Sequence, residues 1–281
     1  MSHVPRIGFM QGRLCAPVDG KVQAFPWEDW QAEFVTAQAL EFDLMEWTID
    51  QDRLRENPLM TADGQQRIRE LREATGVDIL SVTGDCFMQA PFYKESGPSS
   101  RELLRDLSDV LQASSRLGIR HVLMPLVDNG SLASAEQERS LRDGLLPLRP
   151  MLTSAGLKIL FELDLEPARA ATFIDAFPGD AFGVNYDVGN SAALGFDTRE
   201  EVAAYGHRID NVHVKDRELN GTTVPPGTGN ARFDRTFGAL KQAGYSGNLI
   251  LQTARDGNGE HGRALDSYRR MTRDWWASGG A

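Results

Sequence analysis

Four side chains able to bind a metal stand at the ends of four successive short apolar runs. They are Glu162, Asp187, His213 and Gln252. Two carboxylates, one imidazole and one amide oxygen suit a divalent cation such as Mn²⁺, Mg²⁺, Co²⁺ or Zn²⁺. The simpler alternative is that the ionisable groups only pair with one another, since buried charges rarely lack partners. Their recurrence at four consecutive run ends favours a cation site.

A lysine shares the expected orientation of the histidine. Lys215 follows His213 by two positions, so alternation of side chains along a strand places both on one face. There Lys215 serves as an acid or as a partner for developing negative charge. Equally, it forms an ion pair with Asp187, Glu162 or Asp216. The sequence leaves both roles open.

Three arginines follow the expected first, seventh and eighth strands. The planar forks of Arg13, Arg217 and Arg255 suit carboxylate or phosphate oxygens, so we expect them to bind an anionic substrate. Asn185 shares a strand face with Asp187 and is also assigned to substrate binding. Together these residues predict a small-molecule pocket rather than an extended surface.

Two further carboxylates are expected at strand ends and are also assigned to substrate binding. Glu46 is predicted to end the second strand, where it acts as an alternative base or caps a hydrogen-bond network, and we favour the network. Asp85 follows the third strand in the segment Thr83-Gly84-Asp85-Cys86-Phe87. It binds a substrate hydroxyl or only caps a turn.

A glycine-rich loop, residues 227–230, precedes a helix expected from Phe233. Its backbone N–H groups are of the kind that bind an anion ahead of a helix. Because Pro225 and Pro226 stand beside it, the loop is also of the kind that folds over a site as a lid. The lid is the favoured interpretation.

These residues need elements that bring them together. The sequence predicts eight short apolar strands: Arg6–Met10, Phe42–Trp47, Asp78–Thr83, Ile119–Met124, Lys158–Leu163, Phe182–Asp187, Ile209–Val214 and Asn248–Gln252. Amphipathic helices are predicted between them at Trp27–Leu40, Asp63–Thr75, Ser100–Leu117, Ser134–Ala155 and Phe233–Ala243. The last four are each followed by a glycine, the residue that favours a left-handed turn after a helix.

Strict alternation of strand and helix predicts a parallel sheet. Eight units predict closure into a single (β/α)₈ barrel spanning residues 1–281 as one domain. The alternative, an open doubly wound sheet, usually has a GxGxxG turn after its first strand, whereas this chain has Gln11-Gly12-Arg13-Leu14. Barrel active sites lie at the carboxyl ends of the strands, where the polar residues above would converge.

Composition limits the partners. The chain has 281 residues, 30 Lys+Arg and 40 Asp+Glu, for a net charge of −10, which argues against nucleic acid binding. No run of roughly 20 apolar residues is present, so we expect no membrane partner. With two separated cysteines and no signal-peptide pattern, we expect a cytoplasmic protein.

The chain resembles the xylose-isomerase-like superfamily of sugar phosphate isomerases and epimerases over essentially its whole length. The resemblance rests on the segments Gly8–Leu14, Met45–Trp47, Phe161–Asp164, Asn185–Asn190, Val212–Asp216 and Pro226–Asn230. It implies a TIM barrel with a metal held at the ends of strands five to eight, and it favours homodimers or homotetramers. Glu162, Asp187 and His213 match the metal-binding pattern in residue type.

The fourth position departs from that pattern. The best-studied epimerases of the superfamily carry a glutamate where this chain has Gln252, and their two glutamates exchange a proton with opposite faces of the substrate. A glutamine still offers its carbonyl oxygen to a metal, but it is no base near neutral pH. Glu162 is therefore our first choice for a single base.

We expect a divalent-metal-dependent isomerase or epimerase of a small sugar, keto-sugar or sugar phosphate, acting through an enediolate. The first alternative is a metal-dependent lyase or dehydratase on a keto-sugar or cyclitol ketone, which begins with the same proton loss. A non-catalytic sugar-binding barrel is less favoured. A DNA-repair endonuclease, found elsewhere in the superfamily, is least favoured because only His213 among the histidines ends a strand.

Two adjacent tryptophans near the C-terminus, Trp275 and Trp276, have two interpretations. They hold the last helix against the barrel, or they form a contact between subunits, because large aromatic side chains are frequent at interfaces. The sequence does not decide between the two.

Overall fold

A computed structural model describes residues 4–21 and 23–279 of the chain. Ten strands are present in that part: β1 (Ile7–Met10), β2 (Leu44–Ile49), β3 (Asp78–Gly84), β4 (His121–Leu126), β5 (Lys158–Leu163), β6 (Phe182–Asp187), β7 (Ile209–Val214), β8 (Asp216–Arg217), β9 (Thr223–Val224) and β10 (Asn248–Leu251). Eight of them close into a parallel barrel in the order β1-β10-β7-β6-β5-β4-β3-β2, and β8 and β9 form a separate antiparallel hairpin. The predicted (β/α)₈ barrel is confirmed.

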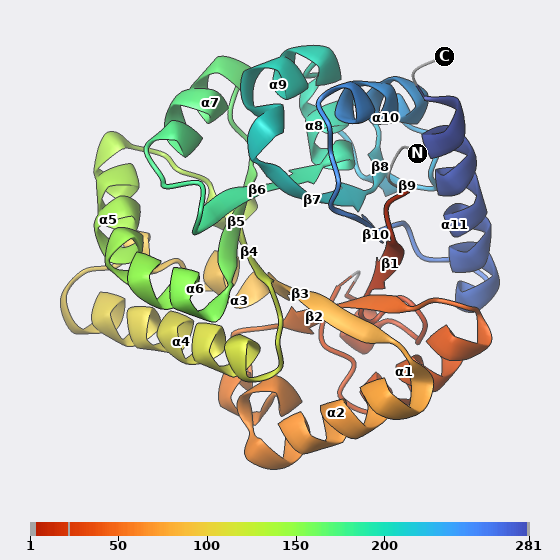
Figure 1. Cartoon of the computed structure of the whole chain (residues 1–281), viewed down its shortest axis with the longest axis horizontal. Coiled ribbons are helices and arrows are strands. Elements are labelled where there is room, and N and C mark those ends of the chain that lie inside the picture. The colour runs from red at the N-terminus through yellow and green to blue at the C-terminus, as the bar shows by residue number, and fades with distance from the viewer. Residues whose placement is uncertain (1–3, 22, 280–281) are drawn as a thin grey trace.

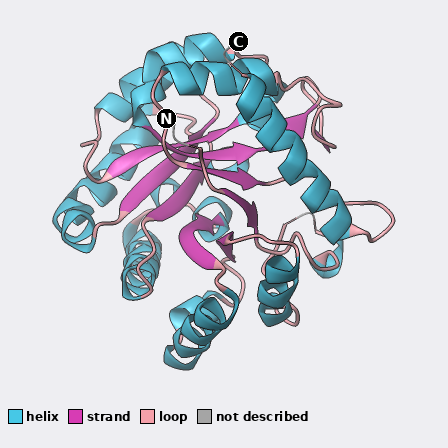
Figure 2. Ribbon diagram, turned by 45° about the vertical axis from the view of Figure 1, so that its right-hand side comes forward, coloured by secondary structure: helices cyan, strands magenta, loops and turns pink. Residues whose placement is uncertain are grey.

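The short helix that follows β3 lies inside the ring that the other helices form around the barrel (Figure 1). Eleven α-helices are present in the described residues. They are α1 (Trp30–Ala39), α2 (Ala62–Thr75), α3 (Asp85–Gln89), α4 (Gly97–Arg116), α5 (Ala135–Leu145), α6 (Arg149–Ala155), α7 (Pro167–Asp175), α8 (Val188–Leu194), α9 (Thr198–Tyr205), α10 (Phe233–Gln242) and α11 (His261–Ser278). Seen obliquely, the strands lie inside this ring (Figure 2). No helix in the described part of the chain is both long and apolar enough to cross a membrane.

The outer faces of the strands are apolar because they pack on the helices, whereas the barrel interior also holds buried polar side chains such as Glu46, Asn211 and His213. Met10, Leu44 and Ile250 form a small apolar cluster separate from the main core. The four glycines that follow the predicted helices all have positive φ, between 64° and 76°, as the sequence pattern requires. Those glycines are Gly76, Gly118, Gly156 and Gly244.

Several predicted boundaries were wrong. The fourth strand, expected over Ile119–Met124, starts and ends two residues later, at His121–Leu126. The helix expected over Ser134–Ala155 is interrupted by a 3₁₀ turn at Leu146–Leu148, because Pro147 and Pro150 lack the N–H groups that a continuous α-helix needs. The second strand was expected over Phe42–Trp47, but it starts and ends two residues later, at Leu44–Ile49.

The adjacent tryptophans hold the last helix in place. Trp275 stacks on Phe233 with ring centroids 4.3 Å apart, and Trp276 contacts Phe237 at 5.6 Å. Both partners belong to α10, so the contact joins α11 to the outer ring of the barrel. The first interpretation of this pair is therefore confirmed.

Candidate functional site

Three adjacent strands bring together the carboxylates and the imidazole. Glu162 comes from β5, Asp187 ends β6, and His213 lies in β7 directly opposite Asp187 in the strand register. All three side chains are buried, and one ligand atom from each lies within 4.8 Å of the others. Three ligands at the carboxyl end of a barrel form a cluster of the size that a cation requires.

The histidine shows that these residues fit a cation. His213 Nε2 lies 2.7 Å from Glu46 Oε1, which leaves Nδ1 as the ring atom that faces the other carboxylates. Nδ1 is buried and has no hydrogen-bond partner among the described residues, at 3.4 Å from Glu162 and 3.9 Å from Asp187. An unpartnered nitrogen between two carboxylates is a ligand position.

The electrostatics of the cluster favour a positive charge at its centre. Burial opposes a charged imidazole, but Glu46, Asp187 and Glu162 outweigh it and raise the pKa of His213 well above its usual value. Burial likewise opposes the Asp187 carboxylate, but Lys215 and His213 hold its pKa well below the usual range. The imidazolium proton and a divalent cation would therefore compete for the same carboxylates.

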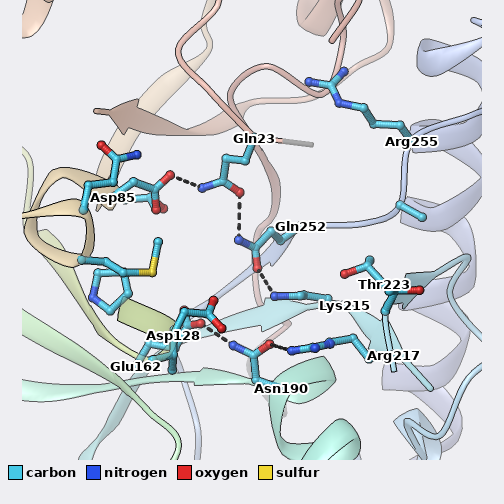
Figure 3. A pocket seen from close by; sticks show the side chains of 17 residues that line it. Gln23, Asp85, Asp128, Glu162, Asn190, Lys215, Arg217, Thr223, Gln252 and Arg255 are labelled. Carbon is cyan, nitrogen blue, oxygen red and sulfur yellow. Dashed lines mark hydrogen bonds between the residues drawn. The ribbon is translucent and has the colours of Figure 1, made fainter. Parts of the chain in front are cut away.

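Glu162 is held by amide groups on both oxygens. Asn185 Nδ2 donates to Oε2 at 3.0 Å, and Asn190 Nδ2 donates to Oε1 at 2.6 Å. Asn190 in turn accepts from Arg217 at 2.9 Å. The carboxylate of Glu162 thus faces the cavity in one fixed orientation (Figure 3).

Lys215 joins the fourth expected ligand to this cluster. Its Nζ lies 3.0 Å from Asp187 Oδ2 and 3.3 Å from Gln252 Oε1. The ion pair with Asp187 is one of the two interpretations of Lys215, and the same ammonium group also reaches the cavity. A role in proton transfer remains a prediction.

Glu162, Lys215 and Gln252 line a cavity of about 670 Å³ at the mouth of the barrel (Figure 3). Six residues predicted for the site line it: Asp85, Glu162, Lys215, Arg217, Gln252 and Arg255. Its volume fits a small sugar or sugar phosphate. The cavity also exposes Thr222 and Thr223, whose hydroxyl groups suit a polyhydroxylated ligand.

Three residues expected to bind substrate are absent from the cavity lining: Asn185, Arg13 and Glu46. Asn185 is buried and contacts Glu162 and Asn211. Arg13 is buried, donates to the Thr253 carbonyl at 3.1 Å and reaches Gln23 at 3.3 Å. Their contacts hold the walls of the site.

The position predicted for Glu46 was wrong. Because β2 extends to Ile49, this carboxylate lies inside the barrel and is fully buried beneath the site. Glu46 accepts hydrogen bonds from two hydroxyl groups and two side chains of β7: Ser81, Thr83, Asn211 and His213. Of the two roles considered, the structure shows the network.

The loop after β9 does not offer its N–H groups to an anion. Those of Gly227 and Gly229 donate to Asp216 Oδ2 at 2.8 and 2.9 Å, and that of Ala231 donates to Oδ1 at 2.9 Å. The buried carboxylate of Asp216 already satisfies them, so the anion-binding interpretation was wrong. A movement of this loop as a lid stays a prediction.

Sequence reasoning missed two residues of the site. Gln23 reaches in from the loop after β1 and donates to Asp85 at 2.6 Å, but a glutamine in an irregular loop gives no signal in the sequence. Asn190 did have a signal: it stands three residues after Asp187, whose carboxylate caps α8 through the Asn190 N–H. That spacing turns Asn190 toward the barrel mouth.

Asp85 lies at the start of α3 and faces the cavity. Burial, with a contribution from Asp50, raises its pKa to about 7. The hydrogen bond from Gln23 opposes that rise. Its role in holding a substrate hydroxyl stays a prediction.

Comparison with known proteins is consistent with this architecture. Residues 34–274 match the family model described as Xylose isomerase-like TIM barrel. The chain is 28% identical over 254 residues to L-ribulose-5-phosphate 3-epimerase UlaE of Escherichia coli K12, covering 85% of this chain and 88% of that protein.

Solved structures share the fold. D-psicose 3-epimerase from Clostridium cellulolyticum H10, solved with D-tagatose, superposes with a TM-score of 0.74 at 13% identity, covering 96% of this chain and 99% of that one. The IOLI protein with a bound zinc atom gives a TM-score of 0.75 at 18% identity, with coverages of 98% and 99%.

Proposed function

Because the chain belongs to the xylose isomerase-like TIM barrel family, we propose that it is a divalent-metal-dependent isomerase or epimerase of a small sugar, keto-sugar or sugar phosphate. One observation carries the proposal: the unpartnered Nδ1 of the buried His213 faces Glu162 and Asp187, and Glu162 also lines the cavity. The epimerase activity of the UlaE relatives supports the reaction class. The ligands would be Glu162, Asp187, His213 and the amide oxygen of Gln252.

Proton transfer at carbon needs a base, and of the carboxylates that line the cavity Glu162 is the one that also belongs to the cluster with Asp187 and His213. When bound, a divalent cation polarises a carbonyl and stabilises the negative charge of an enediolate. Glu162 removes the proton next to that carbonyl and returns it to the neighbouring carbon, which gives a positional isomer. Epimerisation at one carbon would require a second group, for which Lys215 is the candidate acid, to deliver a proton from the opposite face. Gln252 has no basic lone pair for this step, so the reaction proceeds with one base.

The remaining cavity residues orient the substrate. Arg217 and Arg255 lie at the mouth and suit a phosphate or another anionic group at the far end of a sugar. Asp85 accepts a hydrogen bond from a substrate hydroxyl. Lys215, whose ammonium lies beside Asp187, stabilises negative charge on the substrate oxygens.

Deuterium exchange tests the proposal. A panel of keto-sugars and their phosphates is incubated with the protein and Mn²⁺ in D₂O, and products are followed by NMR and mass spectrometry. We expect one deuterium to enter at the carbon next to the carbonyl, together with a stereochemical or positional isomer. No exchange with any member of a broad panel would contradict the proposal.

The same experiment separates a second function. A dehydratase begins with the same proton loss and then expels a hydroxyl group, and the single base proposed here is compatible with that sequence. An isomerase conserves the mass of its substrate apart from the deuterium, whereas a dehydratase product is lighter by one water. Product mass therefore assigns the reaction class.

A further inference from the structure

Four polar side chains form a continuous chain of hydrogen bonds across the mouth of the cavity (Figure 3). Lys215 Nζ donates to Gln252 Oε1 at 3.3 Å, and Gln252 Nε2 donates to Gln23 Oε1 at 3.0 Å. Gln23 Nε2 then donates to Asp85 Oδ2 at 2.6 Å. The chain joins the loop after β1 with the ends of β3, β7 and β10.

The partners of Gln23 fix the direction of its amide. The Asp85 carboxylate, when ionised, has no hydrogen to donate, so it requires the NH₂ group of Gln23. On the other side, Arg13 Nη2 lies 3.3 Å from Gln23 Oε1, and a guanidinium can only donate. Reversing this amide would place NH₂ against a guanidinium and an oxygen against a carboxylate.

The orientation of the Gln23 amide determines the orientation of the Gln252 amide. Because Gln23 presents its oxygen, Gln252 must present its NH₂ group to that side. Its own oxygen then faces Lys215, whose ammonium also can only donate and lies 3.0 Å from Asp187. The oxygen of Gln252 is therefore on the side of the carboxylate cluster.

We infer that Asp85, Arg13 and Gln23 are positioning residues that hold the Gln252 amide with its oxygen toward the cation site. The inference rests on the proposed function. A glutamine is a metal ligand only through its oxygen, since the amide nitrogen carries hydrogens and no available lone pair. An amide free to rotate would spend part of the time with its nitrogen toward the cation, which would weaken cation binding. The hydrogen bonds with Gln23 and Lys215 prevent that reversed orientation.

Mn²⁺ affinity measured by isothermal titration calorimetry on the metal-stripped full chain tests this. Gln252→Met removes the ligand, and we expect Mn²⁺ to bind about 10-fold more weakly. Gln23→Met keeps the ligand but removes its orientation, and we expect a loss of about 3- to 10-fold. Gln89→Met is the matched control, because Gln89 borders the same cavity but bonds Asp50 and the Gln51 N–H.

The double variant Gln23→Met/Gln252→Met gives the decisive comparison. If Gln23 acts through Gln252, the double variant binds Mn²⁺ no more weakly than Gln252→Met alone. A further loss in the double variant, or unchanged affinity in Gln23→Met, would overturn the inference while leaving the proposed function standing. Circular dichroism confirms that each variant is folded.

Wild-type protein sets the reference for both ideas. If it binds Mn²⁺ and Gln23→Met does not differ from it, only the positioning role fails. If wild-type protein binds no Mn²⁺ at all, the proposed cation site fails and this inference fails with it. The two failures are thus distinguishable in one set of titrations.

Discussion

The two sides of the candidate site are built in different ways. On one side, Glu162, Asp187 and His213 project from the adjacent strands β5, β6 and β7. On the other side, Gln23 comes from an irregular loop and Gln252 follows the end of β10. The strand side presents the ionisable groups of the proposed cation site, and the loop side presents the amides of Gln23 and Gln252, which Asp85 and Lys215 hold by hydrogen bonds.

The difference shows what fixes the position of each side chain in this site. Strand residues receive their positions from the barrel register, as the direct pairing of Asp187 with His213 shows. Gln23 has no such register. The backbone N–H of Gln252 still bonds the Val214 carbonyl of β7 at 3.1 Å, but the direction of its side-chain amide depends on the hydrogen-bond chain that ends at Asp85. We therefore propose that the strand side supplies the base and most of the cation ligands, and that the loop side orients the remaining ligand, Gln252.

The largest effect is expected on the strand side. Replacing Glu162 by Gln removes the base, keeps the shape, and should lower turnover by about 10³-fold with the fold intact. The matched variant Glu166→Gln, an exposed position after the same strand, should turn over like wild type. Steady-state kinetics on the substrate found by exchange measure both, and near-wild-type turnover in Glu162→Gln would remove Glu162 as the base.

A smaller effect is expected from replacing Glu46, which lies beneath the proposed cation ligands inside the barrel. Glu46→Gln leaves a single acceptor oxygen for four donors, so Mn²⁺ affinity should fall about 10- to 100-fold and unfolding free energy by about 2 kcal/mol. Glu201→Gln is the control, since Glu201 is a buried carboxylate on α9 that bonds Tyr186 and Tyr205. That control should lose stability but keep Mn²⁺ affinity, and equal Mn²⁺ losses would refute a specific role for Glu46.

The smallest effect concerns the loop side. Glu33 is buried and accepts from the Gly12 and Leu14 N–H groups at 2.9 and 3.0 Å, which holds the loop after β1. Burial raises the pKa of Glu33 to about 7 from 4.5, despite those bonds and nearby Arg255 and Arg13. The folded state therefore binds a proton that the unfolded state has released, and this stabilisation is lost as pH rises through 7.

Urea unfolding at pH 6 and pH 8 checks this expectation. Wild-type protein should lose about 1 kcal/mol more between the two pH values than Glu33→Gln, which has no proton to release there. The exposed variant Glu28→Gln serves as the matched control and should behave as wild type. The same pH dependence in wild type and Glu33→Gln would show that the carboxylate does not titrate in this range.

Most of the fold was predictable because it depends on short-range pattern. Buried parallel strands are apolar runs, and β5, β6 and β7 have the predicted bounds. The failures have local causes: Pro147 and Pro150 divide one helix, and β2 and β4 are each displaced by two residues. Strand ends depend on pairing with neighbours, which apolar pattern alone does not encode.

The site was predictable where strands carry it. Glu162, Asp187 and His213 converge because parallel strands all end at one rim. Glu46 was misplaced because a shift of two residues keeps a side chain on its face but moves it one layer deeper. Gln23 was missed because its position depends on the path of a loop with no periodicity.

The four donors on Glu46 have a consequence for how this chain tolerates change over evolutionary time. They come from β3 and β7, so one carboxylate on β2 links side chains on opposite sides of the barrel. A single substitution at Glu46 leaves several buried donors without an acceptor, and each costs about 1–3 kcal/mol. Descendants that lose this carboxylate should therefore replace Ser81, Thr83 or Asn211 in the same lineage, as a coordinated set.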